Sequence, residues 1–245
     1  MGAQYSGLSM IFRAFATDYD GTIARDGIVN ASTIAALGRL RAAACRLILV
    51  TGRELEDLSR CMPRMDLFDL IVAENGALLH RPATQETRML AEPAPEAFIA
   101  RLREMGVDPL SVGRSIVATT VPNDVKIRMV IDELGLDHEI ILNKGSVMVL
   151  PYGTSKESGL RAALDELGIL PSATVAAGDA ENDLPFLNLC GMTVAVANAL
   201  PVLKQYAHLV TRGSHGEGVE ELIDRWLAGN LVALPAAQAG REPCR

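Results

Sequence analysis

The sequence predicts an α/β fold in which a parallel sheet carries helices on both faces and a smaller α+β unit is inserted. Two observations predict the sheet: four short apolar runs each end in glycine or polar residues, and a helical pattern lies between the first two runs. A third observation predicts the insertion, because the middle of the chain instead shows helices alternating with strands and a hairpin.

The four apolar runs are short and continuous, as expected for strands that are buried on both faces. They cover residues 11–17, 47–50, 70–73 and 173–177. Residues 31–44 have apolar side chains at helical spacing and Asn30 or Ser32 as the N-cap, so this segment is predicted to be a helix. Strand, helix and strand in succession make a right-handed crossover, which predicts a Rossmann-like core.

The inserted unit is predicted from helices that end at glycine and from strands joined by a tight turn. Its expected elements are helix 95–105, strand 115–120, helix 123–134 and strands 138–142 and 146–150. The predicted domains are a discontinuous core, 10–83 and 153–228, an inserted unit, 84–152, and a frayed tail, 229–245.

Composition excludes several classes of protein. The chain has 245 residues, 49% of them hydrophobic and 22% charged, which is typical of a globular protein. Its net charge of −7 argues against a broad surface for nucleic acid or anionic membrane. No apolar run is long enough to span a membrane, no signal peptide is visible and the four cysteines form no CxxC pair. These features predict a cytoplasmic protein; its oligomeric state and the choice of Met1 or Met10 as the start stay open.

Polar side chains gather where the predicted strands end. In open parallel sheets, ligands bind outside the carboxyl ends of the strands. This rule places Asp18, Asp20, Thr51, Asn75 and Asp179 on one rim of the sheet.

The first strand is followed by the motif Asp18-Tyr19-Asp20-Gly21-Thr22. Two carboxylates at this spacing could divide nucleophilic attack and proton transfer between them. The alternative is a turn that merely ends the strand.

The last of the four strands runs into Gly178-Asp179-Ala180-Glu181-Asn182-Asp183. Oxygen ligands at this spacing suit a hard cation such as Mg²⁺, and Asn182 could hold a neighbouring ligand. The alternative is an acidic first turn of a helix that complements the helix dipole.

Two further positions suit an anion. Thr51, Gly52 and Arg53 offer a hydroxyl, a backbone amide and a cation to a phosphate oxygen, although a plain strand end is equally compatible with them. Lys156 begins the predicted helix 156–167, where its charge opposes the helix dipole unless an anion is near. A solvent-exposed lysine is the alternative for that position.

Together, in this order, these motifs resemble the haloacid dehalogenase-like (HAD) phosphatases, in the Cof-type branch (type IIB) whose cap is inserted after the third core strand. The match includes the two acidic motifs, Lys156, and three further stretches. These are Val50-Thr51-Gly52-Arg53, Glu74-Asn75-Gly76-Ala77 and Val196-Ala197-Asn198-Ala199.

The resemblance implies a role for each motif residue. Asp18 is expected to be the nucleophile that forms an aspartyl-phosphate, and Asp20 the acid and base. Mg²⁺ is expected on Asp18, the Asp20 carbonyl, Asp179 and, directly or through water, Asp183. Thr51, Gly52 and Lys156 would hold the phosphoryl group, and Asn182 would steady Lys156 or the metal loop.

The inserted unit would then be a cap that reads the leaving group. Its cationic candidates are Arg114, Lys126, Arg128 and Lys144, and the core adds Arg53 and Asn75 as candidate substrate contacts. The expected activity is Mg²⁺-dependent hydrolysis of a small phosphorylated metabolite, either a sugar phosphate or a phosphoglycolate-like acid. A phosphomutase of the same fold and a non-catalytic metabolite-binding module remain alternatives.

Overall fold

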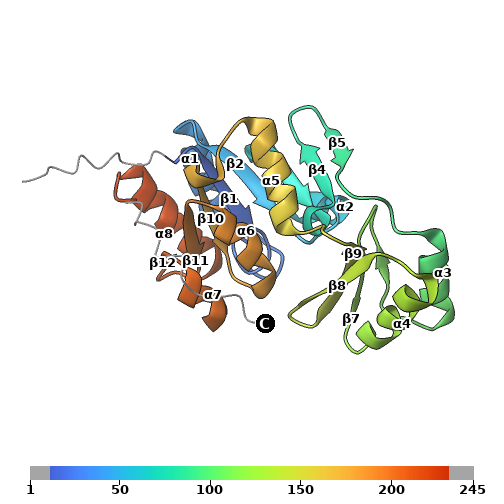
Figure 1. The fold of residues 1–245 in the computed structure, drawn as a ribbon. Helices are drawn as coiled ribbons and strands as arrows, with labels where there is room; N and C mark the ends of the chain where they lie inside the picture. Colours follow the sequence, from blue (N-terminus) through green and yellow to red (C-terminus); the bar gives the residue numbers. More distant parts are fainter. Residues whose placement is uncertain (1–11, 232–245) are drawn as a thin grey trace, which may run out of the picture.

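The computed structural model describes residues 12–231, which build two sheets of unequal size (Figure 1). The larger sheet has eight strands and forms the core, and a four-stranded antiparallel sheet forms the inserted unit, called the cap below. Both the α/β class and the inserted second unit are thus as predicted. The expectations about Met10 and about most of the tail concern residues outside the described part.

The core sheet has the strand order β12-β11-β10-β1-β2-β3-β4-β5. Its first six strands run parallel, and β4 and β5 are added antiparallel at one edge. The eight strands, in chain order, are β1 (Ala14–Asp18), β2 (Arg46–Val50), β3 (Leu70–Ala73), β4 (Leu78–Arg81), β5 (Glu86–Met89), β10 (Thr174–Gly178), β11 (Met192–Ala195) and β12 (Leu209–Val210).

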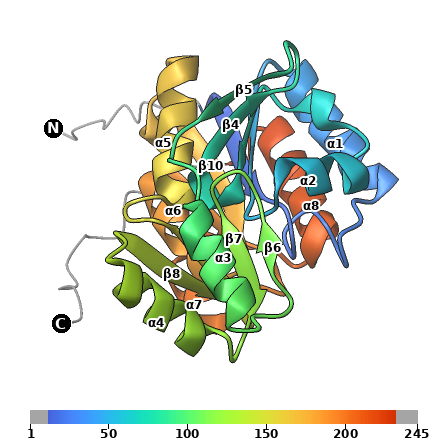
Figure 2. The same cartoon turned by 90° about the vertical axis from the view of Figure 1, so that its right-hand side faces the viewer.

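Helices cover both faces of the core sheet, and Figure 2 shows α5 and α6 on one side with α1 and α8 on the other. The central strands β1, β2, β3 and β10 are almost entirely buried, as their continuous apolar sequences require. The core helices are α1 (Ala31–Ala42), α2 (Leu55–Cys61), α5 (Lys156–Leu167), α6 (Leu184–Leu189), α7 (Pro201–Tyr206) and α8 (His215–Leu227). Short 3₁₀ turns cover Met65–Leu67, Glu74–Gly76, Pro171–Ala173 and Glu181–Asp183.

The cap packs two helices against one face of its sheet, which has the order β6-β7-β9-β8. A small apolar core including Phe98, Leu102, Ile127 and Val147 joins the helices to the strands. The elements of the cap are α3 (Glu96–Glu104), β6 (Ser111–Val112), β7 (Val117–Thr120), α4 (Asp124–Leu134), β8 (His138–Asn143) and β9 (Ser146–Pro151).

The strand that leads into the cap corrects one predicted boundary. Residues from 84 onwards were expected in the inserted unit, but β5 pairs with β4 in the core sheet through Met89. β4 runs back along β3 because three successive residues, Glu74, Asn75 and Gly76, have positive φ and turn the chain there. The turn over residues 82–85, where Gln85 also has positive φ, then brings β5 onto β4. Within the described residues, no helix is long and apolar enough to cross a membrane.

Candidate active site

The first acidic motif lies at the carboxyl end of β1, inside the molecule. Asp18 is buried, and the Thr22 hydroxyl donates a hydrogen bond of 3.1 Å to its Oδ2. Gly21 has φ +88°, and a Cβ there would lie 2.3 Å from Oδ2 of Asp179. Only glycine therefore lets this loop approach the second acidic motif so closely.

The second acidic motif follows β10 and is folded around Asp183. Oδ2 of Asp183 accepts hydrogen bonds from the backbone N–H groups of Asp179, at 2.8 Å, and of Ala180, at 3.0 Å. Both oxygens of Asp183 are engaged, because Oδ1 accepts from Lys156. This carboxylate therefore closes the start of the helical segment after β10, while Asp179 pairs with Lys144. The expected role of Asp183 as a ligand of Mg²⁺ stays a prediction.

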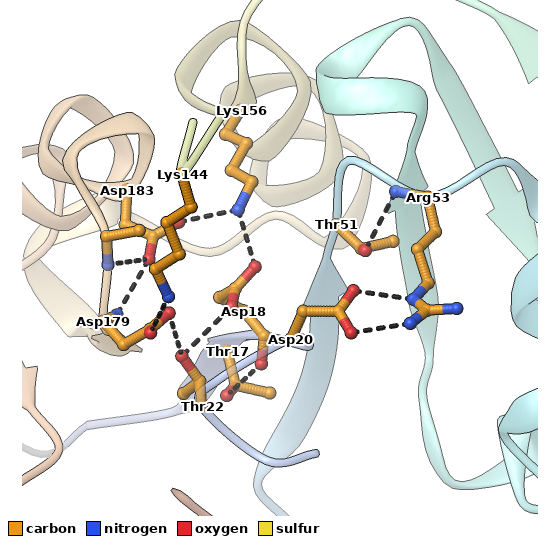
Figure 3. A network of polar contacts seen from close by, with 11 residues as sticks. Thr17, Asp18, Asp20, Thr22, Thr51, Arg53, Lys144, Lys156, Asp179 and Asp183 are labelled. Atoms are coloured by element: carbon orange, nitrogen blue, oxygen red, sulfur yellow. Dashed lines mark hydrogen bonds and ion pairs between the residues drawn. The ribbon is translucent and has the colours of Figure 1, made fainter. Parts of the chain in front are cut away.

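Lys156 is the buried cation of the site. It begins α5, where its charge opposes the helix dipole, and the Ser155–Ser158 capping box satisfies the helix end beside it. Its Nζ lies 2.6 Å from Oδ1 of Asp18 and 2.6 Å from Oδ1 of Asp183 (Figure 3). The anion that the unfavourable helix position predicted is thus a pair of carboxylates.

The electrostatic balance of this cluster favours a further cation. Asp18, Asp179 and Asp183 are all buried, and each offers an oxygen within 4.8 Å of the others. Burial, followed by the charge of Asp183, raises the pKa of Asp18 to about 8 despite Lys156. Burial also raises the pKa of Asp179, although Lys144 opposes that shift. Burial alone would lower the pKa of Lys156, but the charges of Asp18 and Asp183 outweigh it and hold this pKa above its ordinary value.

The three buried carboxylates have only two lysines, Lys144 and Lys156, to balance their negative charge. Carboxylate oxygens are hard donors, which Mg²⁺ prefers. A divalent cation therefore fits this donor set.

Asp20 turns away from the buried cluster toward Arg53. Nε and Nη2 of Arg53 donate to the two carboxylate oxygens of Asp20, at 2.6 and 2.7 Å (Figure 3). Nη1 of Arg53 pairs with Asp57, and the guanidinium lies 5.3 Å from the centre of the Tyr19 ring. Thr51 is buried, and its Oγ1 accepts a hydrogen bond from the Arg53 N–H.

A cavity of about 500 Å³ lies between the strand ends and the cap. Its core wall includes Asp18, Asp20, Thr51, Gly52, Arg53, Lys156, Asp179 and Asn182. Its cap wall consists of Ala118, Thr119, Asn143, Lys144, Ser146 and Met148. The cap wall of this cavity therefore contains one charged side chain, the cation Lys144.

Lys144 reaches the cavity from the turn between β8 and β9. Lys144 and Gly145 both have positive φ, as a two-residue hairpin turn requires. The hairpin points back to the core in Figure 1, and Nζ of Lys144 lies 2.5 Å from Oδ2 of Asp179. This lysine is therefore the cationic cap candidate that the structure brings to the acidic cluster.

The other cationic cap residues predicted to contact the substrate, and Asn75, do not line the cavity. The side chain of Arg114 pairs with Glu56 at 2.6 Å, Lys126 donates to the Gly106 carbonyl, and neither lines the cavity; Arg128 is also outside that lining. Asn75 is buried and does not line the cavity.

Among the described residues, the side-chain amide oxygens of Asn75 and Asn182 accept no hydrogen bond. Asn182 lines the cavity, whereas Lys156 is held by Asp18 and Asp183 rather than by this amide.

Sequence reasoning left one supporting residue without a role. Nδ2 of Asn198 donates to the Gly21 carbonyl at 2.7 Å, and its Oδ1 accepts from the His215 N–H at 2.7 Å. This side chain therefore ties the Asp18 loop to the start of α8. The sequence pointed to Asn198 because it belongs to the Val196–Ala199 motif. No neighbouring residue, however, indicated that it would bind the distant Gly21 carbonyl and His215 N–H.

Comparisons with known proteins agree with this geometry. A family model described as haloacid dehalogenase-like hydrolase matches residues 15–120 and 138–223. A phosphoglycolate phosphatase of Methanothermobacter thermautotrophicus is 32% identical over 223 residues, which cover 88% of this chain and 99% of that protein. A phosphoglycolate phosphatase 2 of Saccharolobus solfataricus is 29% identical, with 88% and 93% covered.

Solved structures share the fold. A protein of Thermoplasma acidophilum superposes with a TM-score of 0.74 at 17% identity, covering 89% of this chain and 99% of that one. A HAD subclass IIB sugar phosphatase gives 0.71 at 19% identity, covering 89% and 100%. The fold and site thus define a capped α/β hydrolase. The chain belongs to the haloacid dehalogenase-like hydrolases, which confirms the resemblance.

Proposed function

We propose that this protein is a Mg²⁺-dependent phosphomonoesterase whose substrate is a small phosphorylated acid of the phosphoglycolate type. The observation that supports it best is the buried Lys156, held between Asp18 and Asp183 at the floor of the cavity. A cation in this position attracts a phosphoryl group directly onto the Asp18 carboxylate. The names of the relatives support the same class of reaction and the same kind of substrate.

In the proposed reaction, an oxygen of Asp18 attacks phosphorus and the bond to the leaving oxygen breaks. Asp20, released from Arg53 and protonated from solvent, gives this proton to that oxygen, so the leaving group departs as an alcohol. Asp20 then removes a proton from a water molecule that attacks the aspartyl-phosphate. Inorganic phosphate leaves, and the Asp18 carboxylate is restored.

The remaining residues bind and orient the substrate. Lys156, the Thr51 hydroxyl and the Gly52 amide would hold the oxygens of the phosphoryl group. Mg²⁺ would be held by Asp18, Asp179 and the Asp20 carbonyl, with Asp183 near it, and would offset the repulsion between the phosphate dianion and Asp18. Asn182 lines the same wall of the cavity.

The cap side of the cavity favours an anionic leaving group over a sugar. Lys144 supplies the positive charge of this wall, beside apolar Ala118 and Met148. An ammonium group in that position suits a carboxylate on the leaving group. The wall also offers neutral polar groups, Thr119, Asn143 and Ser146, which a sugar could use, so the single cation is the observation that supports the acid.

The test is phosphate release from a panel that includes 2-phosphoglycolate, phosphoglycerates and sugar phosphates, with Mg²⁺ or with EDTA. We expect metal-dependent release that is fastest with 2-phosphoglycolate, and no release by the Asp18→Asn variant. Release that is fastest with hexose phosphates would refute the acid as substrate. Absence of release from every ester would refute the phosphatase, and bisphosphate primers would then test a mutase.

A further inference from the structure

Glu74 is a fully buried carboxylate that the proposed reaction does not use. It follows β3 at the rim of the core sheet, and its φ of +49° places it in the left-handed region, which a glutamate rarely adopts. A backbone held in this conformation requires surrounding contacts that stabilise it.

Those contacts come from the cap. Oε1 of Glu74 accepts the N–H of Arg114 at 2.9 Å, and Oε2 accepts the N–H groups of Ser115, at 2.8 Å, and Ile116, at 2.9 Å. All three partners are donors, so they suit a carboxylate and offer a protonated acid no acceptor. Gly113 permits the approach, because a Cβ there would lie 2.8 Å from the Glu74 carboxyl carbon.

The backbone around Glu74 is bonded to the phosphate side of the site. The N–H of Glu74 donates to the Arg53 carbonyl at 2.9 Å, and the N–H of Asn75 donates to the Thr51 carbonyl at 2.9 Å. Gly76 packs against the Ser155 carbonyl, immediately before Lys156. One short segment thus contacts the cap, the Thr51–Arg53 loop and the start of α5.

We propose that Glu74 is a positioning residue that fixes the cap to the core and thereby determines the position of the Lys144 ammonium group in the cavity. The cap contacts the acidic cluster through the long, half-exposed side chain of Lys144, which cannot by itself define the orientation of the cap. The buried Glu74 carboxylate binds backbone groups of the cap and supplies the fixed point. The kinetic part of this inference rests on the proposed phosphatase function.

The experiment compares Glu74→Gln with the wild-type protein on two esters. We expect kcat/KM for 2-phosphoglycolate to fall about 10- to 100-fold, as a small misplacement of a binding group does. For p-nitrophenyl phosphate, whose leaving group offers Lys144 no anion, we expect a change of less than about threefold, since the core rim is intact. Equal losses on both esters, or no loss on either, would overturn the inference.

A second readout does not depend on activity. Amide hydrogen exchange at Arg114, Ser115 and Ile116 should accelerate in Glu74→Gln, while the amides of β1 and β10 keep their protection. Unchanged exchange at the three cap amides would refute the anchoring role even if the protein released no phosphate from any ester. Failure of the proposed function and failure of this inference are therefore separable.

Two further variants test the Glu74 contact from the cap side and supply a control. Gly113→Ala disturbs the same contact from the cap side and leaves Glu74 in place, so it should reproduce both effects even if Glu74→Gln does not fold. Glu56→Gln breaks only the exposed ion pair of Arg114 in the same loop, and it should leave both readouts unchanged. A Gly113→Ala protein with wild-type kinetics and exchange would count against the proposal.

Discussion

The core rim and the cap contribute to one cavity by different physical means. On the rim, Asp18, Asp183 and Lys156 are buried and hold one another at hydrogen-bonding distance. On the cap, Lys144 extends from a hairpin turn with about half of its side chain exposed. In the proposed reaction, the groups that perform chemistry are thus fixed before the substrate arrives, whereas the proposed reader of the leaving group, Lys144, can adapt.

The largest expected effect comes from removing Asp18, the proposed nucleophile on the rim. Asp18→Asn should lower kcat at least about 1,000-fold, because the amide oxygen cannot displace the leaving group. The change is nearly isosteric and Lys156 keeps its bond to Asp183, so we expect the fold to persist. Phosphate release and circular dichroism of the same preparation check both statements. Substantial turnover in a folded variant would contradict the assignment of Asp18.

Lys156→Met should affect both activity and stability, since it leaves two buried carboxylates without their shared cation. We expect the free energy of unfolding in EDTA to fall by about 3–5 kcal/mol, the usual cost of breaking a buried ion pair. The value of kcat/KM should fall about 100- to 1,000-fold, as on removal of a single preorganised donor. Urea denaturation and phosphate release measure the two effects.

Lys144→Met is the matched control for that stability effect. Its side chain is half exposed although its partner Asp179 is buried, so we expect a loss of stability clearly smaller than that of Lys156→Met. If both lysines proved equally important for stability, the distinction between a fixed rim and an adaptable cap would be lost.

On substrates, Lys144→Met should act selectively. We expect kcat/KM for 2-phosphoglycolate to fall about 10- to 100-fold, the equivalent of one charge-assisted hydrogen bond. Activity on p-nitrophenyl phosphate should stay within about twofold, because that leaving group carries no carboxylate to bind. Steady-state kinetics on both esters give the answer. Equal losses of kcat/KM on the two esters would mean that Lys144 acts on the phosphoryl group rather than on the leaving group.

The same contrast explains what the sequence could predict. The rim was predictable because each residue follows a short apolar strand, and parallel strands bring their carboxyl ends together. Lys156 was identifiable because a lysine in the first turn of a helix needs a nearby anion. These signals lie within a few residues of the groups they concern, so spacing alone placed Asp18 and Asp179 near one another, whereas the family resemblance was needed to place Lys156 beside them.

What the sequence could not reveal depends on distant pairing. Glu74 finds its partners about 40 residues away in the cap, and Asn198 contacts Gly21 across 177 residues. No periodicity or propensity encodes such contacts, since they depend on how the two sheets meet. The antiparallel strands β4 and β5 were not predicted for a related reason: three residues with positive φ turn the chain from β3 into β4, and two of them are not glycine.

The smallest expected effect separates cap cations that face the cavity from those that do not. Arg114→Ala removes an exposed ion pair with Glu56 but keeps the backbone N–H that Glu74 binds. Because such pairs contribute about 0–1 kcal/mol, stability should change by no more than that. The ranking of substrates in the phosphate-release panel should be unchanged, with each kcat/KM within about twofold of wild type. A reordered ranking in Arg114→Ala would mean that this arginine swings into the cavity when substrate binds, and the leaving group would then be read by two cap cations instead of Lys144 alone.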